Sequence, residues 1–152
     1  MKVDAPEKPA ADSQVELKQR ALRYLVRREH SRAELARKLA PHAESAEAVE
    51  AVLDLLLSKK QQSDERFASE RARVLSRKYG SAKIRQDLKA RGIADEVVDR
   101  VAAGGELERA RAILERKFPL KAQSREEHAK RARFLQRRGF SYDIIRSVLK
   151  VE

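Results

Sequence analysis

Basic side chains recur at matching positions in three blocks of the chain, and these are the residues whose spacing could serve to bind an acidic partner. The blocks are residues 21–31, 71–81 and 131–141, and the last two are identical at six of eleven positions. Cations repeated along one surface bind an extended polyanion or the acidic groove of a protein filament. The three triplets are Arg23, Arg27 and Arg28; Arg73, Arg77 and Lys78; and Arg133, Arg137 and Arg138.

The middle of the chain carries the largest basic excess. Residues 66–91 hold nine Lys/Arg and two Asp/Glu, a net charge of +7, and the helix after the middle block adds Lys83, Arg85 and Lys89. Arg and Lys also serve any solvated helix face, so the alternative is a surface that only confers solubility. Recurrence at matching positions favours a partner-binding stripe made of the three triplets and these three residues.

Residues typical of catalysis are present but not arranged for it. The chain has no cysteine, and His30, His42 and His128 lack metal-ligand spacing. Ser31 and the serines that end the other two blocks, Ser81 and Ser141, are placed to cap helices. With no nucleophile, base and orienting group together, we expect no catalytic residue, metal, cofactor or small-molecule substrate, and no enzyme.

The aromatic side chains leave two interpretations open. Tyr24, Tyr79, Phe134, Phe140 and Tyr142 lie among basic residues, where they could stack on unpaired bases. Tyr24 and Phe134 also fall within apolar stripes, which is more typical of core residues.

Composition and periodicity predict an all-α protein. Of 152 residues, 41% are hydrophobic, 5% are aromatic, five are Gly and four are Pro, so strand and turn formers are scarce. Apolar residues recur at helical spacing throughout. Leu35, Ile84 and Ile145 each follow one of the three blocks and are predicted to occupy matching core positions.

The repeated blocks divide this helical pattern into three tandem three-helix repeats. We expect that no single repeat buries its apolar face alone and that each closes its core partly against its neighbours. Repeats that pack in this way form an elongated helical array. The predicted segments are a disordered leader at 1–14 and repeats at 15–62, 63–104 and 105–152. The chain lacks an apolar run long enough for a membrane span, and its polar start is not a secretory signal. We therefore expect a cytoplasmic monomer.

Three longer segments resemble the RecX family of regulators of the RecA recombinase. They are RREHSRAELARKLA (27–40), SRKYGSAKIRQDLKARGI (76–93) and RARFLQRRGFSYDIIRSVL (131–149). Ser81 stands where many members have proline. The resemblance implies three three-helix repeats and a non-catalytic regulator, which modulates recombinational DNA repair and the SOS response.

By resemblance, the partner is the RecA–DNA filament. Binding there would inhibit filament growth, ATP hydrolysis, strand exchange and co-protease activity. The alternative function is a direct binder of single- or double-stranded DNA that uses the same basic stripe. The family motifs name no individual contact residue, so the stripe rests on the repeated blocks.

Overall fold

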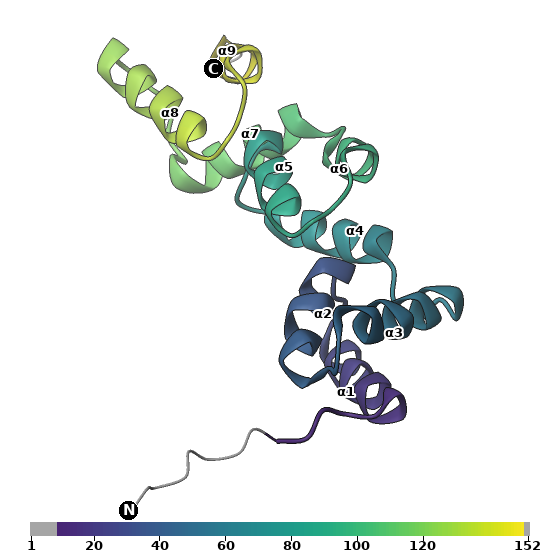
Figure 1. Ribbon diagram of the computed structural model, residues 1–152. Coiled ribbons are helices and arrows are strands. Elements are labelled where there is room, and N and C mark those ends of the chain that lie inside the picture. Colours follow the sequence, from purple (N-terminus) through teal and green to yellow (C-terminus); the bar gives the residue numbers. More distant parts are fainter. Residues whose placement is uncertain (1–8, 151–152) are drawn as a thin grey trace, which may run out of the picture. The chain divides into compact units, whose positions relative to one another are not determined.

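The computed structural model describes residues 9–150, and within them the chain forms nine α-helices and one short 3₁₀ turn, with no strand (Figure 1). The all-α prediction is confirmed. The helices are α1 (Gln14–Arg27), α2 (Arg32–Leu39), α3 (Ala46–Ser58), α4 (Asp64–Leu75), α5 (Ser81–Ala90), α6 (Asp95–Ala102), α7 (Glu106–Lys117), α8 (Arg125–Arg137) and α9 (Tyr142–Lys150).

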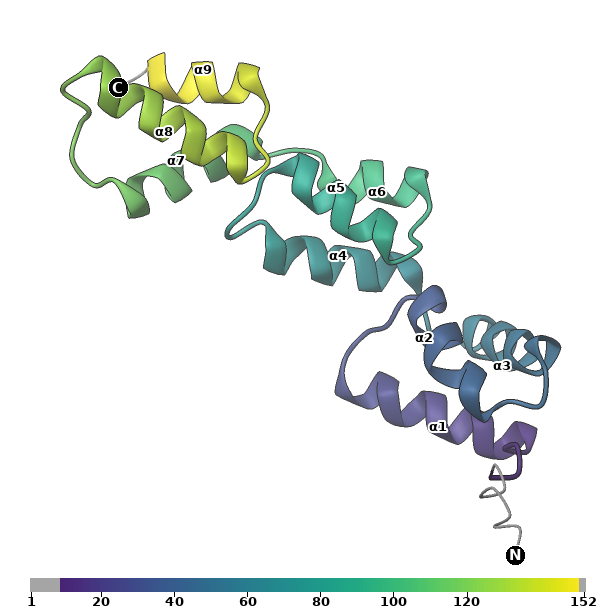
Figure 2. The same cartoon turned by 60° about the vertical axis from the view of Figure 1, so that its left-hand side comes forward.

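These helices form three groups of three, within two compact units. One unit ends at Ser63 and contains α1–α3, and the other begins at Asp64 and contains α4–α9. In each group the last helix packs on the two before it: α3 on α1 and α2, α6 on α4 and α5, and α9 on α7 and α8 (Figure 2). The three-repeat prediction is therefore confirmed, whereas elongation of the array stays a prediction.

Helix α1 begins inside the segment predicted as a leader. Ser13 and Glu16 form a capping box, in which each side chain accepts a backbone N–H of the other residue. Asp12 adds an ion pair with Arg20 at 2.8 Å, and its own N–H donates to the carbonyl of His42. Residues 12–14 are thus ordered by local polar contacts, and residues 1–8 of the predicted leader lie outside the described residues.

Each repeat has its own apolar core. Leu17, Leu35, Leu39, Leu53 and Leu56 are among those that fill the first. In the second, Phe67, Ile84, Leu88, Ile93 and Val98 are buried, and in the third Ile113, Leu114, Leu135, Phe140, Ile145 and Val148. Tyr24 and Phe134 are half-buried and pack against these cores, as the apolar stripes indicated.

The third block matches the first two in sequence, but it lies at a different position within its repeat. Leu35, Ile84 and Ile145 are all buried, as predicted. Leu35 and Ile84 lie on the second helix of their repeats, but Ile145 lies on the third, α9. The similar sequences of 71–81 and 131–141 therefore span different helix junctions, α4–α5 and α8–α9.

A buried polar cluster joins the helices of the first repeat. His30 is 2% exposed, and its Nδ1 lies 3.0 Å from the carbonyl oxygen of Arg28. That oxygen can only accept, so Nδ1 carries the proton and Nε2 accepts from the Lys38 ammonium at 2.8 Å. Gln62, also buried, donates to the carbonyl of His30. The cluster thus needs His30 neutral.

The first prediction concerns the second core. Ile84→Ala should lower the free energy of unfolding by about 2–4 kcal/mol, because it leaves a cavity where a side chain 1% exposed is packed. Gln86→Ala, on the exposed side of the same helix, should cost less than about 0.5 kcal/mol. Urea unfolding followed by circular dichroism compares the two variants, and equal midpoints would contradict this assignment of helix faces.

The second prediction concerns pH. Burial lowers the pKa of His30 despite its bond to the Arg28 carbonyl, so the unfolded chain binds a proton at higher pH than the folded one. The stability that neutral His30 contributes is complete above its unfolded pKa of about 6.5 and is lost as pH falls through the lower folded pKa. His30→Gln should flatten this acid-side decrease in the urea midpoint, and an unchanged decrease would show that another group causes it.

Candidate partner-binding surface

The second and third repeats meet through backbone at two glycines. The N–H of Gly80 donates to the carbonyl of Arg138 at 2.8 Å, and that of Ala82 to the carbonyl of Gly139 at 3.2 Å. A Cβ on Gly80 would lie 2.5 Å from the Gly139 oxygen. A Cβ on Gly139, whose φ is +93°, would lie 2.6 Å from Cγ of Lys83. Only residues without a side chain allow this approach.

Ser81 stabilises this junction by a route other than capping. Gly80 holds the N-cap position of α5, so Ser81 is the first helical residue and its predicted role as a cap is wrong. Its hydroxyl donates to the carbonyl of Ala102 at 2.9 Å, and its N–H donates to the Glu106 carboxylate at 3.1 Å. Ser31 and Ser141 do cap, accepting from Glu34 and Ile144.

Two guanidinium groups lie against backbone carbonyls of the turn that follows α4. Arg116 donates to the carbonyl of Arg77 at 2.6 Å, and Arg138 lies 3.5 Å from the carbonyl oxygen of Lys78. Both carbonyls belong to the turn just after Leu75, where the negative end of the α4 dipole also favours positive charge. The Arg116 side chain from α7 and that of Arg138, which follows α8, therefore lie beside residues 77 and 78.

The ring of Tyr79 contacts cations from the second and third repeats. Nζ of Lys83 lies 5.6 Å from its ring centroid and Cζ of Arg138 lies 5.7 Å from it. Arg138 also lies 5.1 Å from the ring of Phe134. These rings attract the cations electrostatically. We call Arg77, Lys78, Lys83 and Arg138 the junction cations.

Ion pairing separates the twelve predicted binding residues into two classes. Four pair within their own repeat: Arg28 with Glu34, Arg73 with Glu70, Arg85 with Asp99, and Lys89 with Asp95. The other eight have no ion-pair partner among the described residues: Arg23, Arg27, Arg77, Lys78, Lys83, Arg133, Arg137 and Arg138.

The eight unpaired residues do not form one continuous set. The junction cations lie together, as the bonds and ring contacts above establish. Arg133 and Arg137 are exposed along α8, on the second helix of the third repeat. Arg23 and Arg27 are exposed on α1, in the other compact unit.

The blocks also contain arginines with structural roles. Arg71 donates two hydrogen bonds of 2.9 Å to Asp87 and holds the pKa of that carboxyl below its ordinary value, although partial burial opposes the shift. Arg131, the matching residue of the third block, is buried and donates to the carbonyl of Leu120. Arginine at this position therefore supports loop and helix packing.

A group of arginines that the repeated blocks did not predict lies beside the middle triplet. Two adjoining cavities of about 470 and 560 Å³ share Ser76 and Arg109. Arg73 and Arg100 line the first, and Arg77 and Arg116 the second. Arg109 and Arg116 are seven residues apart on α7, which places them on one helix face. That spacing was the available signal, but the near-neutral charge of residues 92–120 concealed it.

Arg109 lies between the second and third repeats, where its guanidinium contacts both Gly104 and Ser81. It donates to the carbonyl of Gly104 at 2.6 Å and lies 3.5 Å from the hydroxyl of Ser81. Its Nε is buried and has no hydrogen-bond partner in the described part of the chain. The guanidinium is therefore fixed at the place where the two cavities meet.

Among residues 9–150, no three His, Asp or Glu side chains are grouped as metal ligands would be. None of the described helices is both long and apolar enough to cross a membrane.

Three family models match the chain in order. They describe the first, second and third three-helix domains of RecX and match residues 18–56, 63–101 and 105–149. Each match covers one of the helix groups α1–α3, α4–α6 and α7–α9.

Individual proteins agree with these models. The regulatory protein RecX of Leptothrix cholodnii is 45% identical, over 91% of this chain and 90% of its own length. That of Neisseria meningitidis serogroup B is 42% identical over 90% and 91%. The fold resembles the crystal structure of RecX from Lactobacillus salivarius, with a TM-score of 0.79, 20% identity and coverage of 91% and 97%. This regulatory chain, built from three three-helix domains, belongs to the RecX family.

Proposed function

We propose that this chain binds the RecA–DNA filament through the basic surface where its second and third repeats meet. The observation that carries the proposal is the group of junction cations, which have no ion-pair partner among the described residues. Such cations keep their charge available for acidic groups of a partner. Two of them, Lys83 and Arg138, lie against the ring of Tyr79, and Arg138 also lies beside the carbonyl of Lys78, which reduces the entropy that these two side chains lose on binding.

The remaining predicted residues extend this contact. Arg133 and Arg137 on α8 add exposed charge beside the junction, and Arg23 and Arg27 give the first repeat a separate contact. Arg28, Arg73, Arg85 and Lys89 contribute less, because a neighbouring carboxylate already offsets the charge of each. Several weak contacts on one chain strengthen each other when the partner is itself repetitive.

The proposed outcome is inhibition without a chemical step. A bound chain opposes filament growth and so lowers ATP hydrolysis, strand exchange and co-protease activity in the cytoplasm. Recombinational repair and the SOS response are modulated as a result. His30, one of the three histidines, is buried and bonded to the Arg28 carbonyl and Lys38, so it has a structural role in the first repeat.

Direct DNA binding is the second candidate, favoured by the net charge of +11 and the same unpaired cations. The two candidates differ in what they require. DNA binding alone weakens with salt on a log–log slope set by the number of phosphates contacted. Filament binding requires RecA and nucleotide.

The third prediction is that this chain inhibits the RecA ATPase on single-stranded DNA at substoichiometric ratios. Growth of a filament depends on few sites, so few bound chains suffice to oppose it. Steady-state ATP hydrolysis with increasing protein measures the effect. An unchanged rate at every ratio would disprove the proposed function, and inhibition only at ratios that coat the DNA would favour the alternative.

The fourth prediction locates the surface. Arg77→Glu with Lys78→Glu replaces two exposed, unpaired cations by anions, so an acidic partner is repelled. The concentration needed for half-inhibition should rise by about tenfold or more. Arg73 is left unchanged, because it already pairs with Glu70 and a glutamate there would add a like-charge repulsion within α4 that is unrelated to a partner.

Two control variants separate position from charge. Arg146→Glu with Lys150→Glu makes the same charge change on exposed residues of α9, and Glu44→Lys with Glu47→Lys changes exposed acidic residues in the first unit. Both should inhibit like the parent chain. If the α9 variant loses inhibition as strongly as the junction variant, total charge decides binding and the junction has no special role.

A further inference from the structure

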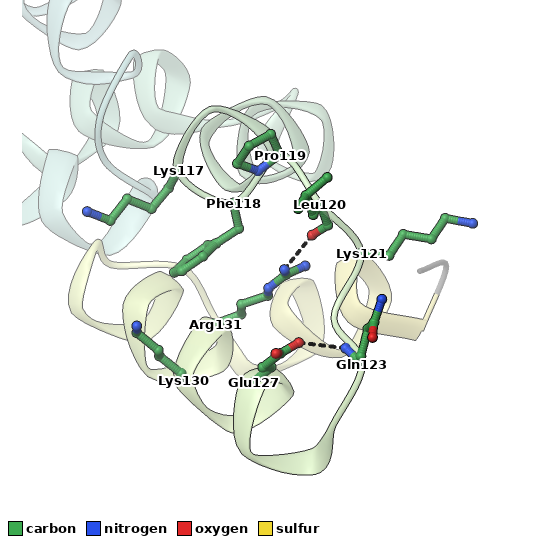
Figure 3. A pocket seen from close by; sticks show the side chains of 9 residues that line it. All are labelled: Lys117, Phe118, Pro119, Leu120, Lys121, Gln123, Glu127, Lys130 and Arg131. Carbon is green, nitrogen blue, oxygen red and sulfur yellow. Dashed lines mark hydrogen bonds between the residues drawn. The ribbon is translucent and has the colours of Figure 1, made fainter.

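The connection between α7 and α8 lines an open cavity of about 390 Å³ in the third repeat (Figure 3). Phe118, Leu120, Lys130 and Arg131 are among its lining residues. It does not share residues with the two cavities beside the junction cations. This cavity is therefore a site distinct from the surface of the junction cations.

The wall of this cavity is fixed in place. Arg131, only 5% exposed, reaches from α8 to donate to the carbonyl of Leu120. At the other end of the loop, the N–H of Gln123 donates to the Glu127 carboxylate at 2.6 Å (Figure 3). A pre-formed site binds a ligand with little cost of ordering the loop.

One part of the cavity is apolar and accessible. Leu120 is 80% exposed, next to Pro119 on the loop. Phe118 packs edge-on against Phe134, with ring centroids 5.6 Å apart and an interplanar angle of 89°. An aliphatic side chain that solvent surrounds this fully gains free energy when a partner's apolar group covers it.

Most of the remaining lining is basic. Lys117 and Lys121 extend to opposite sides of the loop, and Lys130 points toward the ring of Phe118 (Figure 3). Glu127 is the one carboxylate among the described lining residues, and it already accepts the Gln123 N–H. A segment that crosses the cavity mouth would meet positive charge on both sides and apolar surface between.

This combination favours an acidic peptide over a nucleic acid. Stacking of a base needs a free aromatic face. Cations already lie against the Phe118 ring, with Cζ of Arg131 at 5.0 Å and Nζ of Lys130 at 5.9 Å from its centroid, and Phe134 packs against it as well. Carboxylates need only the lysine ammonium groups, and an apolar side chain needs only Leu120 and its neighbours.

We propose that this cavity binds an acidic peptide segment that carries one apolar side chain. The apolar group covers Leu120 and the accessible part of Phe118, while flanking carboxylates pair with Lys117, Lys121 and Lys130. The inference does not rest on the proposed function, because its test contains neither RecA nor DNA filaments, so either can fail alone.

The fifth prediction tests the site with synthetic probes. The first is a fluorescein-labelled peptide of about ten Asp and Glu residues around one central Leu, which spans roughly 33 Å when extended. The second has Ser in place of Leu, and the third is a labelled oligo(dT) of equal charge. Fluorescence anisotropy with the full chain should show tightest binding of the Leu peptide.

Variants then locate the binding. Leu120→Ser removes the apolar contact, and Lys121→Glu with Lys130→Glu reverses the charge; each should weaken binding of the Leu peptide by about tenfold or more. The Arg146→Glu with Lys150→Glu chain, altered outside the cavity, should bind like the parent. Circular dichroism establishes that every variant keeps its helices.

The outcomes decide the proposal. Equal binding of the Leu and Ser peptides would overturn it, because charge alone would then explain the affinity. It would also be overturned if neither peptide binds, if Leu120→Ser has no effect, or if the α9 control weakens equally. Loss of oligo(dT) binding in the cavity variants, with no peptide binding, would identify a nucleic-acid site instead.

Discussion

The close approach of Gly80 and Gly139 is the constraint on which the second compact unit depends. Backbone hydrogen bonds join the two turns, and a Cβ on either glycine would collide with backbone or with Lys83. Because the α4–α5 and α8–α9 junctions meet here, Arg138 reaches Tyr79 and the carbonyl of Lys78. The cations of two repeats become one surface through this contact, although they are about sixty residues apart in the chain.

The similar blocks of the sequence therefore do not occupy equivalent places in the structure. Residues 71–81 and 131–141 are similar, but the first block spans the first two helices of its repeat and the second spans the last two. Their turns contact each other, where an array of equivalent units would have set them apart. This arrangement explains how an arginine-rich motif can serve binding and packing together, with Arg71 and Arg131 holding structure while Arg77 and Arg138 lie at the junction.

The distribution of charge follows the same division of roles. Acidic residues of the second and third helices neutralise some basic side chains within a repeat, as Asp99 does for Arg85 and Asp95 for Lys89. Exposed pairs of this kind add little stability, but they remove charge from the surface that a partner meets. Unpaired cations remain at the junction and on α8, and a separate basic and apolar cavity remains at the loop before α8. The third repeat thus offers two surfaces of different chemistry.

The sequence by itself determined the helices, the three repeats, the buried Leu35, Ile84 and Ile145, and the resemblance to the RecX family, because periodicity, capping residues and motif spacing are local. It did not determine which cations are paired. Asp87 and Asp99 reach their arginines only through helix packing, as Arg109 and Arg116 reach the α4 side of the junction. The role of Ser81 was hidden for the same reason, since Ala102 and Glu106 are brought to it from more than twenty residues away. Contacts between distant segments depend on how the helices pack, and only the tertiary structure decided them.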